Sequence, residues 1–184
     1  MWAERDTGVI TFRQATSFDA GALALIGAAT MLETYADKID GADIVAHSAR
    51  RHSTDFYAAW LQDPTIIIWL AQTQTNAAIG YLVLMPATLP APQPDPSDLE
   101  VQRIYVLSRF HAAGVGHHLM TLAIDAARAR SARQLVLGVM KKNERALAFY
   151  RRQGFTEIGT RTFHVGAATF DDYVLGLPLN GTNT

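Results

Sequence analysis

Cysteine is absent from this sequence of 184 residues. Without it the protein has no disulfide, no metal site built on thiolates and no cysteine nucleophile. Long apolar runs are missing too, since none approaches the roughly 20 residues of a membrane-spanning helix. The first residues carry charges where a secretory signal peptide has its apolar core. We therefore expect a cytoplasmic protein without a membrane partner.

An excess of either charge sign is also lacking. The 16 Lys and Arg residues nearly balance 17 Asp and Glu residues, for a formal net charge of −1. No overall field then attracts nucleic acid, and we expect no nucleic-acid partner. The six histidines show no spacing typical of metal ligands, and the adjacent His117 and His118 point in different directions on a helix. We expect no metal.

The sequence does have the composition of an ordinary globular protein, with 49% hydrophobic and 18% charged residues. Its length suits a single domain over residues 1–184, in a monomer or a homodimer. Five of the seven prolines fall within residues 86–97, which predicts an extended loop in place of a helix or strand. That loop is too short to mark a domain boundary by composition.

Hydrophobic periodicity predicts an α+β protein. The expected strands span residues 8–16, 65–72, 77–85, 98–107 and 133–140, with two more inside 161–179. The expected helices span residues 18–39, 114–131 and 143–154, with two short ones inside 41–63 that break near Ser53. The buried stripes should be Leu23, Ile26 and Thr30 on the first helix, and Val115, Leu119, Leu122 and Ala126 on the helix 114–131. This order indicates helices that cover a mostly antiparallel sheet.

The segment "VLSRFHAAGVGHHLM" (106–120) joins a strand to a helix through two glycines. A helix N-terminus with free backbone N–H groups binds anions, and Gly114 and Gly116 allow a phosphate to approach closely. A dinucleotide fold would need glycine where Leu119 stands, and a P-loop would need lysine where His117 stands. Two interpretations of this segment remain: a phosphate site of another kind, and the simpler alternative of a tight strand–helix turn.

Longer stretches carry a resemblance to a known family. "RIYVLSRFHAAGVGHHLM", followed by "LVLGVMKKNERALAFYRRQGF", resembles the two cofactor motifs of the GNAT superfamily of acetyl-CoA-dependent N-acetyltransferases. The ending "IGTRTFHVGAATFDDYVLGLPL" is similar to that of the PaiA-like spermidine/spermine acetyltransferases. The resemblance implies the GNAT fold, a mixed and mostly antiparallel sheet with a splayed central strand pair flanked by helices.

The resemblance also implies how acetyl-CoA is bound. The superfamily loop has the form Q/R-x-x-G-x-G/A, and its amides hold the pyrophosphate; here His111 replaces the usual Gln or Arg. Main-chain groups around Tyr105 should pair with the pantetheine amides, and Asn143 should contact the cofactor arm, beside its simpler role as a helix cap. The expected cofactor contacts are Ile104, Tyr105, Val106, His111, Ala112, Ala113, Gly114, Val115, Gly116, His117, Asn143 and Tyr150.

Acetyl transfer to an amine needs a base, an oxyanion donor and an acid for the leaving thiolate. The N–H of Val106 is the expected oxyanion donor, and Tyr150 matches the tyrosine that the superfamily places near the sulfur. Glu100 could act as the base through water. The alternatives are a core aromatic for Tyr150 and a solvated strand-end acid for Glu100.

The acceptor is expected to be a small primary amine, with a polyamine as one candidate, that attacks acetyl-CoA directly in a ternary complex. Acidic and aromatic residues suit such a cation: Glu33, Tyr35, Asp37 and Asp172, with Asp171 beside them. Two alternatives stay open. One is a protein or peptide N-acetyltransferase, and the other is a CoA-binding regulatory module without catalysis.

Overall fold

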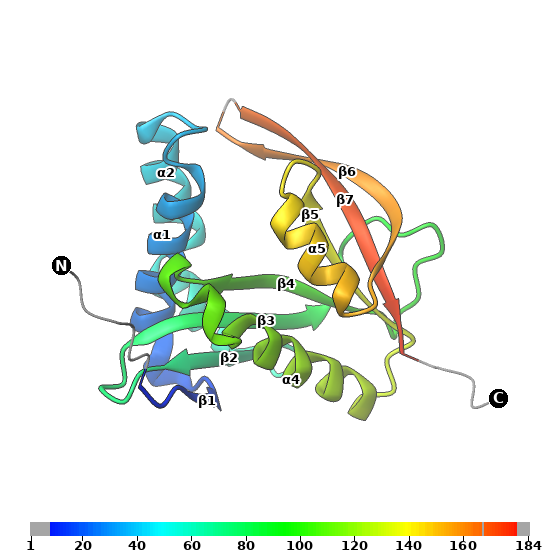
Figure 1. Ribbon diagram of the computed structural model, residues 1–184, viewed down its shortest axis with the longest axis horizontal. Helices are drawn as coiled ribbons and strands as arrows, with labels where there is room; N and C mark the ends of the chain where they lie inside the picture. Colours follow the sequence, from blue (N-terminus) through cyan, green and yellow to red (C-terminus); the bar gives the residue numbers. More distant parts are fainter. Residues whose placement is uncertain (1–7, 167, 180–184) are drawn as a thin grey trace. The chain divides into compact units, whose positions relative to one another are not determined.

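The computed structural model describes residues 8–166 and 168–179 (Figure 1). Its strands are β1 (Thr11–Gln14), β2 (Ile67–Gln72), β3 (Ala78–Pro86), β4 (Leu99–Val106), β5 (Gln134–Met140), β6 (Thr156–Val165) and β7 (Ala168–Pro178). Its helices are α1 (Ala20–Tyr35), α2 (Gly41–Arg51), α3 (Thr54–Gln62), α4 (Val115–Ala129) and α5 (Glu144–Arg152), with 3-10 helices η1 (Ser17–Asp19) and η2 (Ser108–Ala113). None of the described helices has the length and apolarity to cross a bilayer.

Hydrogen bonding orders the strands β1-β2-β3-β4-β5-β7-β6 in a seven-stranded sheet. The pairs β1–β2, β5–β7 and β6–β7 are antiparallel, whereas β4 and β5 are parallel through Leu99–Leu135 and Glu100–Val136. The predicted mixed, mostly antiparallel α+β architecture is confirmed. The described residues form two compact units: unit 1 comprises those up to Val83 with Arg103–Met120, and unit 2 comprises Leu84–Gln102 with those from Thr121 onward. The single domain expected from the length stays a prediction.

The core of unit 1 forms where α1 and α3 pack on the strands β2 and β3. Leu23 and Ile26 of α1 lie in this core, and Thr30 is buried as well, which confirms the predicted stripe. The break between the two short helices is confirmed at Ser53, whose Oγ accepts a hydrogen bond of 3.1 Å from the N–H of Phe56. That cap satisfies a backbone donor at the start of α3.

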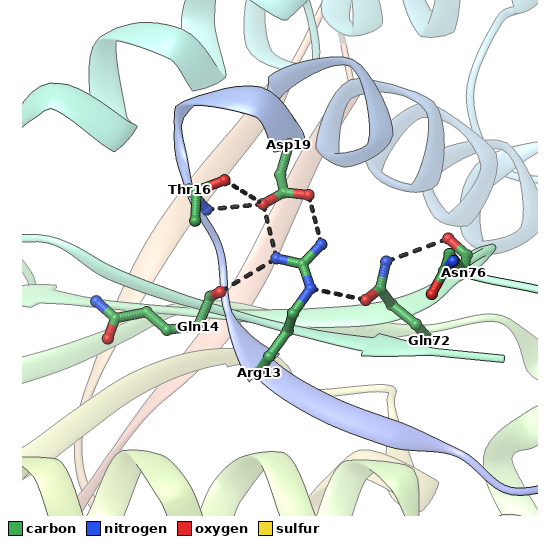
Figure 2. Close-up of polar contacts among 6 residues, drawn as sticks. All are labelled: Arg13, Gln14, Thr16, Asp19, Gln72 and Asn76. Atoms are coloured by element: carbon green, nitrogen blue, oxygen red, sulfur yellow. Dashed lines mark hydrogen bonds and ion pairs between the residues drawn. The ribbon is translucent and has the colours of Figure 1, made fainter. Parts of the chain in front are cut away.

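A charged network fixes the entry into α1 (Figure 2). Arg13 of β1 binds Asp19 through two hydrogen bonds, of 2.8 and 2.6 Å, and donates a third, of 2.8 Å, to Gln72 of β2. Asp19 also accepts from the N–H of Thr16 at 2.7 Å. The arginine thereby lowers the pKa of Asp19 to about 2. One bidentate pair thus joins the first strand, its neighbour and the turn that precedes the helix.

The predicted stripe of α4 is partly wrong. Leu122 and Ala126 are only half-buried, although the spacing placed them in the core. The fully buried side chains of α4 are Val115, Leu119, Met120, Ala123 and Ala127. The buried row advances by four residues at each step, with Met120 beside it, and so turns away from the predicted face. Spacing alone does not choose between two adjacent rows of apolar residues on a helix this rich in alanine and leucine.

The hairpin of β6 and β7 dominates unit 2 (Figure 1). Its pairing begins at Thr156 opposite Gly176, so β6 starts five residues before Arg161, where the sequence placed it. A register shift between Glu157 and Gly159 interrupts the alternation that identifies a strand, which explains the late start. Residues 87–98 contain neither helix nor strand, as their prolines predict.

Candidate active site

The predicted strand–loop–helix turn at 106–116 is confirmed and lies in unit 1. Gly114 has a φ of +75°, a left-handed conformation that glycine adopts without strain. Apart from Gly114 and its two chain neighbours, no atom of the described residues lies within 4 Å of the position that a Cβ on Gly114 would occupy. Val115 then starts α4 with a fully buried side chain. The loop therefore presents exposed backbone at Ala112, Ala113 and Gly114, beside a helix N-terminus anchored in the core.

Two side chains brace this loop. The carboxylate of Glu33 accepts from Ser108 at the start of η2, with 2.9 Å to the backbone N and 3.1 Å to Oγ. The Nε2 atom of His111 lies 2.7 Å from the carbonyl oxygen of Val106. Glu33 is thus an anchor of the loop and not a member of an unpaired acidic patch. His111 folds back onto the strand end.

The end of β4 carries the residues predicted to pair with pantetheine: Ile104, Tyr105 and Val106, all half-buried. Gly80 of β3 lies against them, because a Cβ on it would stand 2.9 Å from the carbonyl oxygen of Tyr105 and 3.0 Å from Cγ2 of Val106. Contacts of 3 Å or less leave no room for any other residue at position 80. The glycine therefore sets how closely β3 supports this segment.

Glu100 belongs to unit 2 and is 1% exposed, so the reading of a solvated strand-end acid is wrong. Its Oε2 accepts from the N–H and Oγ1 of Thr88, at 2.8 and 3.0 Å, and from the N–H of Leu89 at 3.2 Å. Its Oε1 accepts from Gln102 at 2.9 Å. Protonating this carboxylate would sacrifice one of four bonds, which makes it a poor general base. It holds the start of the proline-rich loop.

The helix α5 of unit 2 carries the other two predicted cofactor residues. Asn143 caps it, since Oδ1 accepts a hydrogen bond of 3.1 Å from Ala146, and the cap reading is confirmed. Tyr150 is 8% exposed, and its ring packs edge-on against Phe149 and Phe155, with centroids 5.2 and 5.9 Å away. The ring is therefore part of the core. A catalytic role for the hydroxyl, and cofactor contact by Asn143, stay predictions.

The acids predicted for the acceptor lie in both units and differ in their surroundings. Asp37 is exposed beside Lys38, whose ammonium lies 3.0 Å away and lowers the pKa of the carboxyl. Asp172 of unit 2 is 3% exposed and pairs with Arg161 at 3.1 Å. Its burial raises its pKa, and among the described residues its Oδ1 has no hydrogen-bond partner. Tyr35 is the last residue of α1.

Sequence reasoning missed a polar cluster inside unit 1. Arg103 of β4 is 7% exposed, and its Nη1 donates to Tyr57 Oη at 2.6 Å. Tyr57 Oη lies 2.6 Å from Tyr81 Oη and 2.9 Å from His52 Nδ1. Burial, followed by the charge of Arg103, lowers the pKa of His52 to about 3. The signal in the sequence was a lone arginine inside the apolar strand "VQRIYV". No group of three His, Asp or Glu residues suited to a metal occurs in the described parts of the chain.

Known proteins resemble the chain over most of its length. A family model described as "Acetyltransferase (GNAT) family" matches residues 31–155. An uncharacterised N-acetyltransferase of Mycobacterium tuberculosis is 31% identical over 157 residues, which cover 85% of this chain and 96% of the relative. The PaiA N-acetyltransferase of Thermoplasma acidophilum, solved with coenzyme A, has a TM-score of 0.71 at 16% identity, over 92% of this chain and 99% of its own.

The ribosomal-protein-S18-alanine N-acetyltransferase of Escherichia coli gives a TM-score of 0.68 at 18% identity, over 96% of this chain and 99% of its own. Identities this low establish the fold alone. The fold predicted from the sequence motifs is confirmed.

Proposed function

This chain belongs to the acetyltransferase (GNAT) family and is an acyltransferase, and we propose that it transfers the acetyl group of acetyl-CoA to the primary amine of a small acceptor. The observation that carries the proposal is the loop at Gly114, which lies inside the matched range 31–155. Its left-handed glycine leaves open space where a side chain would stand. A neighbour of the same fold was solved with coenzyme A, which supports the choice of cosubstrate.

In unit 1, we assign the pyrophosphate to the backbone amides of Gly114, Val115 and Gly116. The first N–H groups of a helix have no acceptor within the helix, and the helix dipole favours negative charge at this end. The exposure of the loop backbone and the buried anchor of Val115 support the assignment. Glu33 and His111 act as braces that keep the loop in shape.

The chemistry follows from direct attack of the amine on the thioester. The new C–N bond forms, the C–S bond breaks, the amine gives up a proton and the thiolate takes one up. We assign the oxyanion to the N–H of Val106 and the proton for the thiolate to Tyr150. Because the oxygens of Glu100 are committed to other donors, the proton of the amine leaves through water.

A pair of glycine variants tests the loop. Gly114→Ala places a methyl group in the open space assigned to the pyrophosphate and strains the backbone at a φ of +75°. We expect the Kd of acetyl-CoA in calorimetry to rise roughly 10- to 100-fold, as when hydrogen bonds to a charged group are lost. Gly154→Ala, at a φ of +91° after α5, is the control for backbone strain and should leave the Kd unchanged.

An unchanged Kd in a Gly114→Ala protein with a normal circular dichroism spectrum would exclude this loop. Transfer itself is measured as release of free thiol from acetyl-CoA with a panel of amines. Absence of release with every amine, despite tight binding of acetyl-CoA, would contradict acetyl transfer to a small amine.

A further inference from the structure

Two arginines of unit 1 lie against one aromatic ring without an acidic partner. The guanidinium carbon of Arg51 is 5.2 Å, and that of Arg103 is 5.1 Å, from the centroid of the Phe56 ring. Within residues 8–166 and 168–179, no Asp or Glu forms an ion pair with either arginine. The positive charge at this point is therefore not neutralised by the described chain.

The guanidinium of Arg103 is held in one orientation. Its Nη1 donates to Tyr57 Oη at 2.6 Å and to the carbonyl oxygen of Arg51 at 2.9 Å, and its carbon lies 4.7 Å from the Trp60 ring centroid. Within the described chain, Nε and Nη2 donate to no residue, and neither is among the fully enclosed polar atoms. The guanidinium of Arg103 thus keeps N–H donors on Nε and Nη2, and its other contacts hold these donors in one orientation.

Burial opposes the charge of Arg103, but the hydroxyls of Tyr81 and Tyr57 outweigh it and raise the pKa of this arginine, whereas the pKa values of its cationic neighbours fall. Burial and the charges of Arg103 and Arg50 lower the pKa of Arg51, and burial and the charges of Arg103, Arg51 and Arg50 lower that of His47. Burying a cation without a counter-charge is costly, and an apolar residue of similar size would relieve that cost. A missing negative charge is the simplest physical reason for the buried guanidinium of Arg103, with the exposed Arg51 beside it.

We propose that Arg103, with Arg51 beside it, binds an oxyanion of the acceptor, so that the substrate is an amine that also carries a carboxylate or a phosphate. The planar fork of arginine matches both groups. Arg103 directly precedes Ile104–Val106, the segment assigned to the pantetheine arm, and three residues of strand span about 10 Å. A small molecule can bridge that distance with its amine at one end and its anion at the other.

This inference rests on the proposed acetyl transfer and changes the expected acceptor. A polyamine would add positive charge next to Arg51 and Arg103. The acids of unit 1 predicted to receive such a cation already have partners, since Glu33 binds Ser108 and Asp37 binds Lys38. Among the described buried residues of unit 1, the charged side chain without an ion pair is that of Arg103, and its positive charge favours an anionic acceptor.

Matched amines test the proposal. Amino acids whose amine and carboxylate stand at opposite ends of a carbon chain are compared with the amines formed by removing the carboxylate, and aminoalkyl phosphates are compared with the matching amino alcohols, by thiol release from acetyl-CoA. We expect kcat/KM to be roughly 10- to 100-fold higher for the anionic member of the preferred pair, as for a hydrogen bond to a charged group. The two kinds of pair distinguish a carboxylate from a phosphate.

Variants then locate the effect. Arg103→Gln should abolish the preference by raising the KM of the anionic amine, with the Kd of acetyl-CoA unchanged. Arg103→Lys keeps the positive charge but lacks the planar guanidinium, and it should retain part of the preference for the anionic amine. Arg51→Gln changes an exposed position, so the protein should fold and show a weaker preference. Arg50→Gln removes the same charge from the same helix and, as the control, should leave the ratio unchanged.

Equal acetylation of both members of every pair would overturn the anionic acceptor and leave acetyl transfer standing. If Arg103→Gln and Arg51→Gln both fold and keep the preference unchanged, the assignment of the anion site to these two arginines is overturned. Absence of thiol release with every amine would refute the proposed function, and this inference with it.

Discussion

Burial keeps one residue of this protein neutral, and hydrogen bonds keep another ionised. His52, which is 5% exposed, stays neutral because burial and Arg103 lower its pKa to about 3. Asp19 stays ionised because the hydrogen bonds from Arg13 lower its pKa to about 2. As the pH falls, each group therefore takes up its proton at a lower pH in the folded protein than in the unfolded chain, and the two pH ranges differ.

The histidine predicts a loss of stability in mild acid. Between pH 6.5 and about 3 the unfolded chain protonates His52 and the folded protein does not, so the free energy of unfolding falls as the pH falls. The slope reaches at most about 1.4 kcal/mol per pH unit for one proton. The carboxyl of Asp19 contributes stability above pH 3.8 and loses it only below that value.

Urea unfolding at pH 7.5 and pH 5 measures this effect. The His52→Gln variant should lose less stability between the two pH values than the unchanged protein. His47→Gln is the comparison, because His47 is only half-buried and shifts in the same direction. Equal losses in the unchanged protein and in His52→Gln would show that His52 protonates freely in the folded state.

The hydroxyl of Tyr150 supports a second prediction for a single residue. Tyr150→Phe keeps the ring contacts with Phe149 and Phe155, so the fold should survive. If the hydroxyl protonates the leaving thiolate, kcat should fall roughly 10²- to 10⁴-fold, the range for a general acid. The Kd of acetyl-CoA should stay within a few-fold. Near-normal kcat in the variant would leave Tyr150 as a core aromatic alone.

The packing of α1 depends on a glycine at one place. A Cβ on Gly27 would contact His52 Nδ1 and would stand 2.7 Å from Tyr57 Oη, so this glycine lets the helix approach the polar cluster. Gly21 lies on the same helix, and beyond its own chain neighbours and helix backbone no atom of the described residues lies within 4 Å of a Cβ placed there. The two positions share helix geometry and differ in their surroundings.

This difference predicts that replacing glycine by alanine changes the free energy of unfolding in opposite directions at the two positions. Gly21→Ala should raise the free energy of unfolding by about 0.5–1 kcal/mol, because alanine favours the helix. Gly27→Ala gains the same propensity but crowds His52 and Tyr57, and overpacking costs roughly 1–3 kcal/mol. Thermal or urea unfolding compares them. Stabilisation of both variants would mean that the cluster can shift without cost.

The position of the tryptophans makes cooperativity measurable for the whole molecule. The tryptophans of the described residues, Trp60 and Trp69, lie in unit 1, whereas far-UV circular dichroism reports both units. If residues 1–184 form a single domain, the unfolding midpoints from fluorescence and from circular dichroism should coincide. Acetyl-CoA at 100 times its Kd should raise the free energy of unfolding by about 2.7 kcal/mol. Separate midpoints would identify two domains.

Local features of this protein follow from the sequence by itself. The stripe of Leu23, Ile26 and Thr30, the cap at Asn143 and the turn at Gly114 depend on residues within a few positions of one another. Spacing, capping chemistry and backbone freedom act over that range, so the sequence predicts them without knowledge of the fold. The mixed α+β class follows from the order of such segments.

Contacts between distant residues were decided by the tertiary structure. Glu33 meets Ser108 from 75 positions away, and Arg103 meets Tyr57 from 46. Whether a carboxylate is a ligand or an anchor, as for Glu100, depends on burial and on partners that spacing does not show. The sequence determines which side chains can carry a charge, but folding determines which counter-charge each one meets and how far water reaches it.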